Sequence, residues 1–190
     1  MKKFFLFVFY LALLVGAAML LRPVVEIVEH SVYPLKYSEF VEKQSTIHGV
    51  DKSLVYAVIH CESGFKPDAV SSVGARGLMQ ITEDTFDWIK WKMGDDFSGD
   101  TYDDMFDPET NITYGTFMLG ALIEEFGTID NTLCAYHAGW NNAKNWLKNP
   151  EYSPDGENIT NIPFGDTKKY VNKVTEVMDK YKSLYFYEKE

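Results

Sequence analysis

The spacing of hydrophobic positions divides the chain into one continuous apolar run and a longer region of helical periodicity. Residues 4–21 carry no charge and follow two lysines, Lys2 and Lys3. Roughly 18 helical residues rise about 27 Å, which is just enough to cross the hydrocarbon core of a bilayer. From residue 38 onward, apolar positions recur three and four residues apart, as on amphipathic helices. The pattern therefore predicts a membrane-spanning helix followed by one helical domain.

The N-terminal apolar run is either an uncleaved anchor or a signal peptide that is removed before secretion. Small residues at 15–17 offer a cleavage point, but the run continues to Leu21, beyond the roughly 7–15 apolar residues of most signal peptides. We therefore favour an anchor at residues 1–22, a stalk at 23–36 and a domain at 37–190. Lys2 and Lys3 predict a single-pass cell-membrane protein with a cytoplasmic N-terminus and an extracytoplasmic domain.

Capping residues predict where the helices of the domain begin and end. Ser38 is expected to cap a helix that ends at Gly49, and Asp51 is expected to cap the next one. The other expected elements are a helix capped by Thr82, one from Asp107-Pro108-Glu109 to Gly127, short helices at 133–136 and after Asn141, and a last helix capped by Asp166 or Thr167. Glycine-punctuated residues 71–81 predict turns with short strands, and 93–106 and 149–165 predict surface loops.

Glu62 is the carboxylate that this pattern places at the end of an apolar helix face. Val55 and Val58 lie on the core-facing side of the second helix, and Glu62 follows them at helical spacing. Gly64 is placed to end the helix, so Glu62 lies in the last turn, where the negative end of the helix dipole opposes a carboxylate. Partial burial and the dipole both favour the protonated form. We therefore predict a raised pKa for Glu62, as a general acid near neutral pH requires.

The composition bears on the class of ligand. A formal net charge of −10 argues against nucleic acid, whose affinity rests on lysine and arginine contacts to phosphates. The four histidines show no metal-ligand spacing and only Cys61 and Cys134 are present, so we expect no metal and no cofactor. The two thiols can form a disulfide outside the cell, although two buried thiols are the simpler interpretation. An aromatic share of 15% is a mild indication of a sugar-binding cleft.

Four motifs occur in order along the domain. They are Glu62-Ser63, Ser71-x-x-Gly74-Ala75-x-Gly77-Leu78-Met79-Gln80, Ala135-Tyr136-x-Ala138-Gly139, and Ile162-Pro163-Phe164-x-x-Thr167-x-x-Tyr170-Val171. Together they resemble the lytic transglycosylases with a soluble-lytic-type (SLT) catalytic domain, and the resemblance extends over nearly the whole domain. It implies a mainly α, lysozyme-like α+β fold, in which a small β element lines a substrate cleft of a helical domain.

The resemblance implies that peptidoglycan glycan strands are cleaved without water. Glu62 would protonate the oxygen of the β-1,4 bond between N-acetylmuramic acid and N-acetylglucosamine. The carboxylate would then take the proton of the muramic acid 6-hydroxyl while that oxygen attacks the anomeric carbon, which leaves a 1,6-anhydro end. One carboxyl group acts where ordinary glycosidases use a pair. The aspartates that offer a second carboxyl are Asp84, Asp95, Asp96, Asp100, Asp103 and Asp104.

The glycine-punctuated motif implies three substrate-binding residues, each with a structural alternative. Ser71 would lie beside the acid and the muramic acid side groups, unless it only stabilises a turn. Gln80 would hydrogen-bond the sugar, unless its amide only satisfies backbone groups. Met79 would line the cleft, although a core position is an equally good interpretation.

The two later motifs imply three more. Tyr136 would bring its hydroxyl toward Glu62, and Tyr170 would reach the site from the last helix, unless these rings are core residues. His137 stands where the family usually has asparagine, and Asp166 stands where it usually has glutamate. A histidine in the cleft would make activity sensitive to mildly acidic pH, whereas a structural histidine would not.

Two other functions are compatible with these motifs. A goose-type-like lysozyme would use the same acid but let water attack, giving reducing ends in place of anhydro ends. A non-catalytic wall-binding scaffold would keep the cleft without turnover, although the joint presence of Glu62, Ser71, Gln80 and Tyr136 argues against it. The expected partners are glycan strands, the membrane through the N-terminal helix, and wall-remodelling or secretion machinery.

Overall fold

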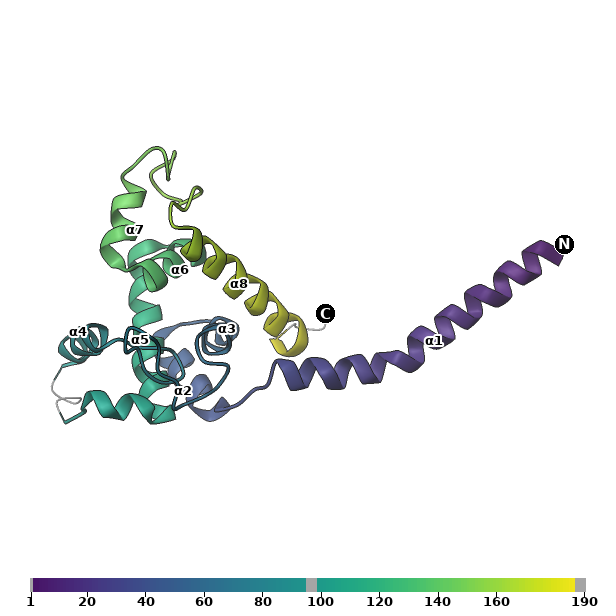
Figure 1. The fold of residues 1–190 in the computed structure, drawn as a ribbon, viewed down its shortest axis with the longest axis horizontal. Coiled ribbons are helices and arrows are strands. Elements are labelled where there is room, and N and C mark those ends of the chain that lie inside the picture. Colours follow the sequence, from purple (N-terminus) through teal and green to yellow (C-terminus); the bar gives the residue numbers. More distant parts are fainter. Residues whose placement is uncertain (1, 95–98, 187–190) are drawn as a thin grey trace. The chain divides into compact units, whose positions relative to one another are not determined.

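The computed structural model describes residues 2–94 and 99–186 and divides the chain into two compact units, Met1–Leu35 and Lys36–Glu190. The first unit contains helix α1. The second unit contains α2 (Ser38–His48), α3 (Lys52–Glu62), α4 (Glu83–Met93), the 3-10 helix η2 (Tyr102–Phe106), α5 (Pro108–Phe126), α6 (Ile129–Ala138), α7 (Trp140–Leu147), α8 (Gly165–Tyr181) and the π-helical turn η3 (Lys182–Phe186). Figure 1 shows this succession of helices along the chain.

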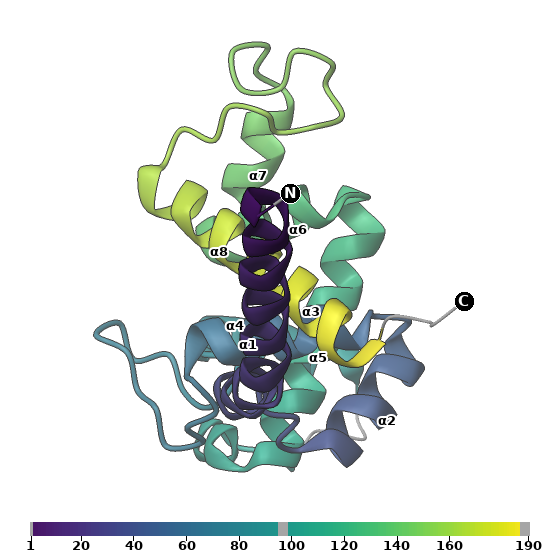
Figure 2. The ribbon, with the colours of Figure 1, turned by 90° about the vertical axis from the view of Figure 1, so that its right-hand side faces the viewer.

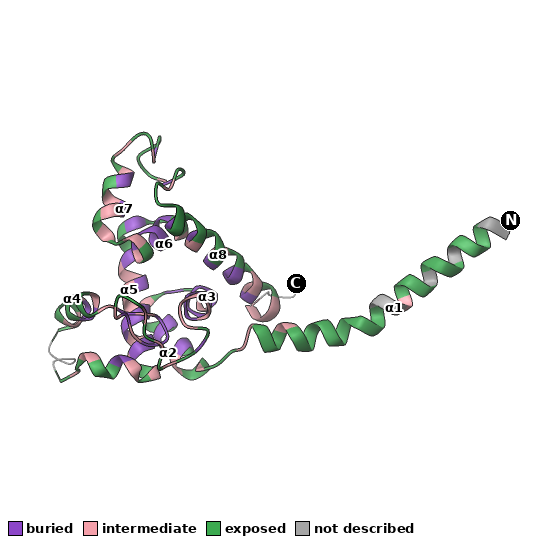
Figure 3. Cartoon of the chain, viewed as in Figure 1, coloured by how far each residue is buried: buried purple, intermediate pink, exposed green. Residues whose placement is uncertain are grey.

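Helix α1 (Lys2–Val32) continues without a break through most of the segment expected to be a stalk. Pro23 lies inside it, where it removes one backbone hydrogen bond without ending the helix. By length and composition, Phe4–Val32 could cross a membrane. Nearly all of its described side chains are exposed (Figure 3), as expected of a membrane helix, whose apolar side chains face lipid rather than a protein core.

The helices that carry the site begin and end largely where the capping residues predicted. Asp51 caps α3 by accepting the backbone N–H of Ser53 at 2.8 Å. Asp107 caps α5 by accepting the N–H of Thr110 at 2.9 Å, and Gly127 ends that helix with a φ of 75°. Ser38, however, is the first residue of α2 rather than its cap, because Tyr37 takes the N-cap position in a left-handed conformation.

The core of the second unit forms where α3, α5, α6 and α8 pack together. α3 lies against α8, α8 lies against α6, and α5 lies against α2 and α6 (Figures 1 and 2). Every residue from Ser53 to Ile59 is buried, so α3 is covered on all sides rather than along one stripe. Figure 3 shows the same concentration of buried residues on α3. Burial of the catalytic candidate's own helix gives Glu62 a rigid base.

Three predicted boundaries differ from the structure. Residues 102–106 were expected in a loop but form η2, because Thr101 and Asp104 make a reciprocal capping box and Met105 is fully buried. The short strands expected at 71–81 reduce, in the part of the chain described, to isolated bridges of Arg76 with Val70 and with Ile81. Neither Asp166 nor Thr167 caps α8, because the helix already begins at Gly165.

Candidate active site

Glu62 is the last residue of α3 and lies partly buried, as its position after the apolar face predicted. Burial raises the pKa of its carboxyl from 4.5 to about 7, while interactions with Tyr170 and Lys173 oppose the rise. The predicted rise in pKa is therefore confirmed, and desolvation is its main cause. A carboxyl with this pKa is protonated in a large fraction of molecules at neutral pH and can donate a proton.

Tyr136 connects the C-terminal end of α6 to the glycine-punctuated segment. Its hydroxyl donates to the backbone oxygen of Met79 at 2.6 Å. Burial and the charge of Glu62 raise the pKa of this hydroxyl well above its ordinary value. The hydroxyl therefore stays protonated, and it lies within the electrostatic reach of the acid.

Tyr170 approaches Glu62 from α8. Burial raises the pKa of this phenol well above its ordinary value, and the charge of Glu62 is the second cause of the rise. Its buried oxygen lies close enough to the Glu62 carboxyl for each group to influence the pKa of the other.

His137 packs on Tyr170 rather than on Glu62. The two ring centroids lie 4.5 Å apart, and Nδ1 of His137 lies 3.0 Å from the Thr167 hydroxyl. The residue is exposed overall, but partial burial of the ring still lowers the pKa of its imidazole, against an opposing effect of Asp166. His137 thus extends the cluster outward, and the buried Thr167 contacts it.

Ser71 and Gln80 stabilise the turns on either side of Arg76. The Ser71 oxygen accepts the backbone N–H groups of Val73 and Ala75, at 3.3 and 3.0 Å. The Gln80 amide nitrogen donates to the backbone oxygens of Ala69 and Gly77, at 3.2 and 2.9 Å. Both side chains therefore bond backbone groups of their own turns, as the structural alternative predicted. The hydroxyl hydrogen of Ser71 and the side-chain carbonyl of Gln80 can still bond a ligand.

The Met79 side chain is fully buried and packs against Gly115, so its carbonyl rather than its thioether joins the site. Asn111 of α5 holds this residue from inside. Its oxygen accepts the N–H of Met79 at 2.8 Å, and its nitrogen donates to the backbone oxygens of Arg76 and Met105, at 3.1 and 2.8 Å. Sequence reasoning missed Asn111, although a polar residue four positions before Gly115 on an apolar helix face was a usable signal.

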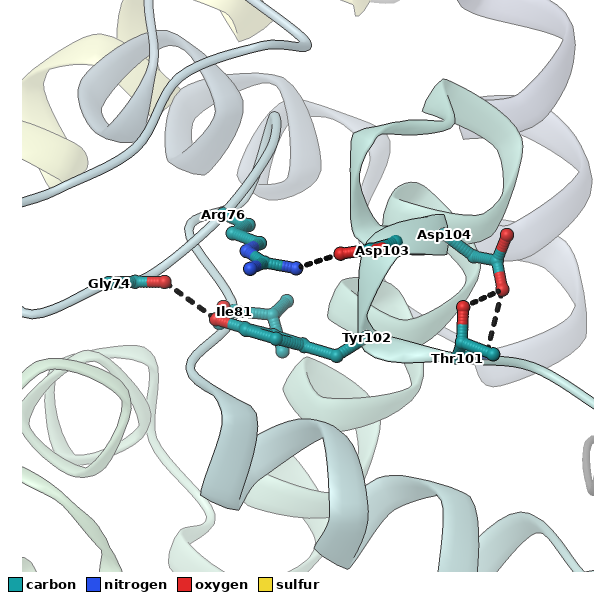
Figure 4. A network of polar contacts seen from close by, with 7 residues as sticks. All are labelled: Gly74, Arg76, Ile81, Thr101, Tyr102, Asp103 and Asp104. Carbon is teal, nitrogen blue, oxygen red and sulfur yellow. Dashed lines mark hydrogen bonds and ion pairs between the residues drawn. The ribbon is translucent and has the colours of Figure 1, made fainter.

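A second support, also missed, holds the same segment from outside (Figure 4). The Tyr102 hydroxyl lies 2.7 Å from the backbone oxygen of Gly74 and 3.0 Å from that of Ile81, so it shares its proton between them. The Arg76 guanidinium lies over the Tyr102 ring at 4.1 Å and pairs with Asp103 at 2.7 Å. The acidic, aperiodic sequence around Tyr102 concealed this role, because neither contact follows from helical or strand spacing.

The aspartates that could have supplied a second carboxyl are mostly engaged elsewhere. Asp100 accepts the hydroxyl of Tyr114 at 2.9 Å, Asp103 pairs with Arg76, and Asp104 bonds Thr101 at 2.7 Å. Asp84 lies in the first turn of α4, and Asp95 and Asp96 lie outside the described residues. Among residues 2–94 and 99–186, Glu62 is the carboxyl that interacts with two phenols, Tyr136 and Tyr170, and whose pKa is raised by burial.

Lys173 is a further charged group that the sequence interpretation missed. It lies on α8 one turn after Tyr170, and its charge opposes the rise in the Glu62 pKa. The spacing of three residues from Tyr170 was a usable signal.

Cys61 and Cys134 are free thiols in the structure, and burial raises the pKa of Cys61 to about 11, so neither is a thiolate at neutral pH. A cavity of about 700 Å³ between α2, α4 and α5 is lined by none of these site residues.

The known proteins to which this chain is similar are lytic transglycosylases. Residues 39–159, more than half of the chain, match the family model described as Transglycosylase SLT domain. The chain is 34% identical over 149 residues to the soluble lytic murein transglycosylase of Escherichia coli K12, covering 75% of this chain and 22% of that protein. It is 29% identical over 172 residues to the membrane-bound lytic murein transglycosylase C of Pectobacterium atrosepticum, covering 77% and 47%.

Solved structures agree with these relatives. The 70 kDa soluble lytic transglycosylase of E. coli superposes with a TM-score of 0.72 at 31% identity, over 82% of this chain and 25% of that chain. An inactive glutamate-to-glutamine mutant of the lytic transglycosylase Slt from Pseudomonas aeruginosa superposes with a TM-score of 0.70 at 28% identity, over 80% and 24%. The chain thus spans between about a fifth and a half of the length of these relatives.

Proposed function

Because the chain belongs to the Transglycosylase SLT domain family, we propose that it is a peptidoglycan lytic transglycosylase. It cleaves the β-1,4 bond between N-acetylmuramic acid and N-acetylglucosamine and leaves 1,6-anhydromuramic acid ends. The observation that carries this proposal is Glu62, a partly buried carboxyl at the end of α3 whose pKa is raised to about 7. A group with this pKa can give a proton and take one back at the same pH.

Glu62 acts twice in the proposed reaction. Its protonated form donates to the glycosidic oxygen, and its carboxylate then accepts the proton of the muramic acid 6-hydroxyl as that oxygen closes on the anomeric carbon. Lys173 stabilises the carboxylate between the two steps, because its charge favours the ionised form. The engagement of Asp100, Asp103 and Asp104 elsewhere supports a single-carboxyl reaction, since a retaining or inverting hydrolase uses a pair.

The substrate-binding roles are part of the same proposal. The Ser71 hydroxyl donates a hydrogen bond to a sugar substituent, and the side-chain carbonyl of Gln80 accepts one. Tyr136 of α6 and Tyr170 of α8 interact with the charge of Glu62, and His137 packs on Tyr170 and extends this cluster outward. Met79 contributes its backbone, since its side chain is buried against Gly115.

We further propose that α1 anchors the protein in the cell membrane by a single pass, with the domain from residue 37 on the extracytoplasmic side. The apolar stretch Phe4–Val32 and the similarity to a membrane-bound relative support this arrangement. An anchored enzyme acts on glycan strands near the membrane, where wall-remodelling or secretion machinery is also assembled.

The test is mass spectrometry of fragments released from purified peptidoglycan by the full chain in detergent micelles. Glu62→Gln keeps the side-chain shape and removes the proton, and Glu124→Gln changes an exposed glutamate of α5 as the matched control. Anhydro-muropeptides from the wild type and the control, but not from Glu62→Gln, support the proposal. Reducing ends would favour a water-using lysozyme, and no release from several wall types would favour a scaffold.

A further inference from the structure

Ser71 and Gln80 lie in two successive turns of the glycine-punctuated segment. In the first turn, the N–H of Ser71 donates to the Ala75 backbone oxygen at 2.9 Å, and the Ser71 backbone oxygen accepts the N–H of Gly74 at 3.0 Å. In the second turn, the N–H of Gln80 donates to the Gly77 backbone oxygen at 3.3 Å. Both side chains are half-buried, so both remain accessible to a ligand. The distance between them depends on how the two turns are joined.

The backbone alone joins these turns weakly. Arg76 lies between them and exchanges two backbone hydrogen bonds with Ile81, at 2.9 and 3.0 Å. This pairing is an isolated bridge, and the described residues of the segment form no longer ladder. Gln80 also has a left-handed φ of 51°, which is unfavourable for a residue with a side chain. Strand pairing this short is marginally stable in water, so the arrangement needs support from the rest of the domain.

Tyr102 of η2 supports both turns with one hydroxyl (Figure 4). Its oxygen lies 2.7 Å from the backbone oxygen of Gly74, in the first turn, and 3.0 Å from that of Ile81, directly after the second. Asn111 holds the segment differently, because its hydrogen bonds to the segment are made within residues 76–79. Tyr102 therefore connects the two turns to each other.

The Tyr102 ring is itself held in place. It packs on the buried Phe86 of α4, with ring centroids 5.8 Å apart. The Arg76 guanidinium lies over the same ring at 4.1 Å. The capping box of Thr101 and Asp104 holds the start of η2. The hydroxyl is therefore a fixed point against which the two turns are set.

We propose that Tyr102 is a positioning residue for substrate binding, because its hydroxyl sets the distance between Ser71 and Gln80. This inference rests on the proposed function, in which these two side chains bond sugar substituents. Without the hydroxyl, the two turns can move relative to each other, and the two side chains no longer meet one glycan strand in a single arrangement. Substrate and transition state lose the same contacts, since neither side chain acts on the reacting bond. The loss is therefore expected in KM rather than in kcat.

The test is a binding measurement on Tyr102→Phe, which keeps the ring beneath Arg76 and removes only the hydroxyl. Calorimetry gives the Kd of purified glycan fragments of N-acetylglucosamine and N-acetylmuramic acid for the full chain in detergent micelles, with Glu62→Gln in every sample to prevent turnover. We expect Tyr102→Phe to weaken binding by about threefold to tenfold, the contribution of one neutral hydrogen bond. Tyr114→Phe is the matched control, because it removes a hydroxyl of α5 that bonds Asp100. Its Kd should equal that of the Glu62→Gln parent.

A kinetic measurement separates positioning from loss of folding. With Glu62 intact, Tyr102→Phe should raise KM by the same factor and leave kcat within about twofold of the wild type. A variant that is partly unfolded would instead lower kcat and leave KM unchanged, because fewer molecules are active. That second pattern overturns the inference.

Arg76→Lys is a second variant that keeps the Tyr102 hydroxyl. It retains a charge for Asp103 but loses the flat stacking on the Tyr102 ring, so we expect a smaller loss of binding in the same direction. A loss larger than that of Tyr102→Phe would show that the guanidinium carries the effect, and it overturns the inference. Equal binding by Tyr102→Phe and its parent also overturns it. No binding by the Glu62→Gln parent itself overturns the proposed function, and the inference with it.

Discussion

Replacing Glu62 by glutamine should abolish turnover and at the same time stabilise the fold above neutral pH. The wild-type carboxyl has a pKa of about 7 in the folded chain against 4.5 as its ordinary value. Because the folded state holds this proton more tightly, folding stability is highest below pH 4.5 and is lost as the pH rises toward 7. Glutamine is neutral throughout and contributes no such loss. The two proteins should therefore be alike in acid and diverge as the pH rises.

The size of the divergence follows from the shift in pKa. About 2.5 pH units between 4.5 and about 7 correspond to about 3 kcal/mol of unfolding free energy at 25 °C. Glu62 is partly exposed, so water screening reduces the expected gain to about 2–3 kcal/mol at pH 8. For a domain of this size, that is about 5–10 °C in Tm.

Thermal unfolding of both proteins in detergent micelles at pH 4, 6 and 8 measures this difference. Other carboxyls titrate equally in both proteins and cancel. Glu124→Gln, on the exposed face of α5, should stay within about 0.5 kcal/mol of the wild type at every pH. A Glu62→Gln variant whose advantage is the same at all three pH values, or is greatest in acid, would refute the assignment of a raised pKa to burial.

Two further substitutions test the packing beneath the site. Asn111→Ala should destabilise the fold by about 2–4 kcal/mol in urea unfolding, because three backbone groups, in two buried hydrogen bonds and one partly buried one, lose their partner. An unchanged urea midpoint would contradict this. Gly115→Ala should also destabilise, by about 1–3 kcal/mol in the same assay, although alanine is the better helix former, because its Cβ would lie 2.3 Å from the Met79 sulfur. A stabilised variant would show that Met79 can move aside.

Local sequence patterns predicted the parts of the fold that depend on local physics. The cap at Asp51, the apolar face of α3 and the position of Glu62 in its last turn all follow from residues within a few positions of one another. The rise in the Glu62 pKa followed from the last two of these, the apolar face and the position of Glu62. These predictions held because capping and periodicity act within one helix.

The parts that escaped prediction depend on contacts between distant segments. Tyr102 lies 28 residues from Gly74, and Asn111 lies 32 residues from Met79. No spacing rule connects such pairs. The start of α8 escaped for a different reason, since Thr167 has the chemistry of a cap but turns inward to His137. A cap and a buried support use the same hydroxyl, and sequence alone does not distinguish them.

The Tyr136–Met79 hydrogen bond joins residues 57 positions apart, and this separation has a consequence for the order in which the protein folds. Helix α3 and its carboxyl can form from neighbouring residues, whereas closing a loop of that length loses about 4 kcal/mol of chain entropy before the bond is gained. The bond therefore forms with the last long-range contacts rather than with the first helices. A partly folded chain can therefore already contain the helix of Glu62 but lack the contact between α6 and the glycine-punctuated segment. The proposed activity then begins only when the whole domain has closed.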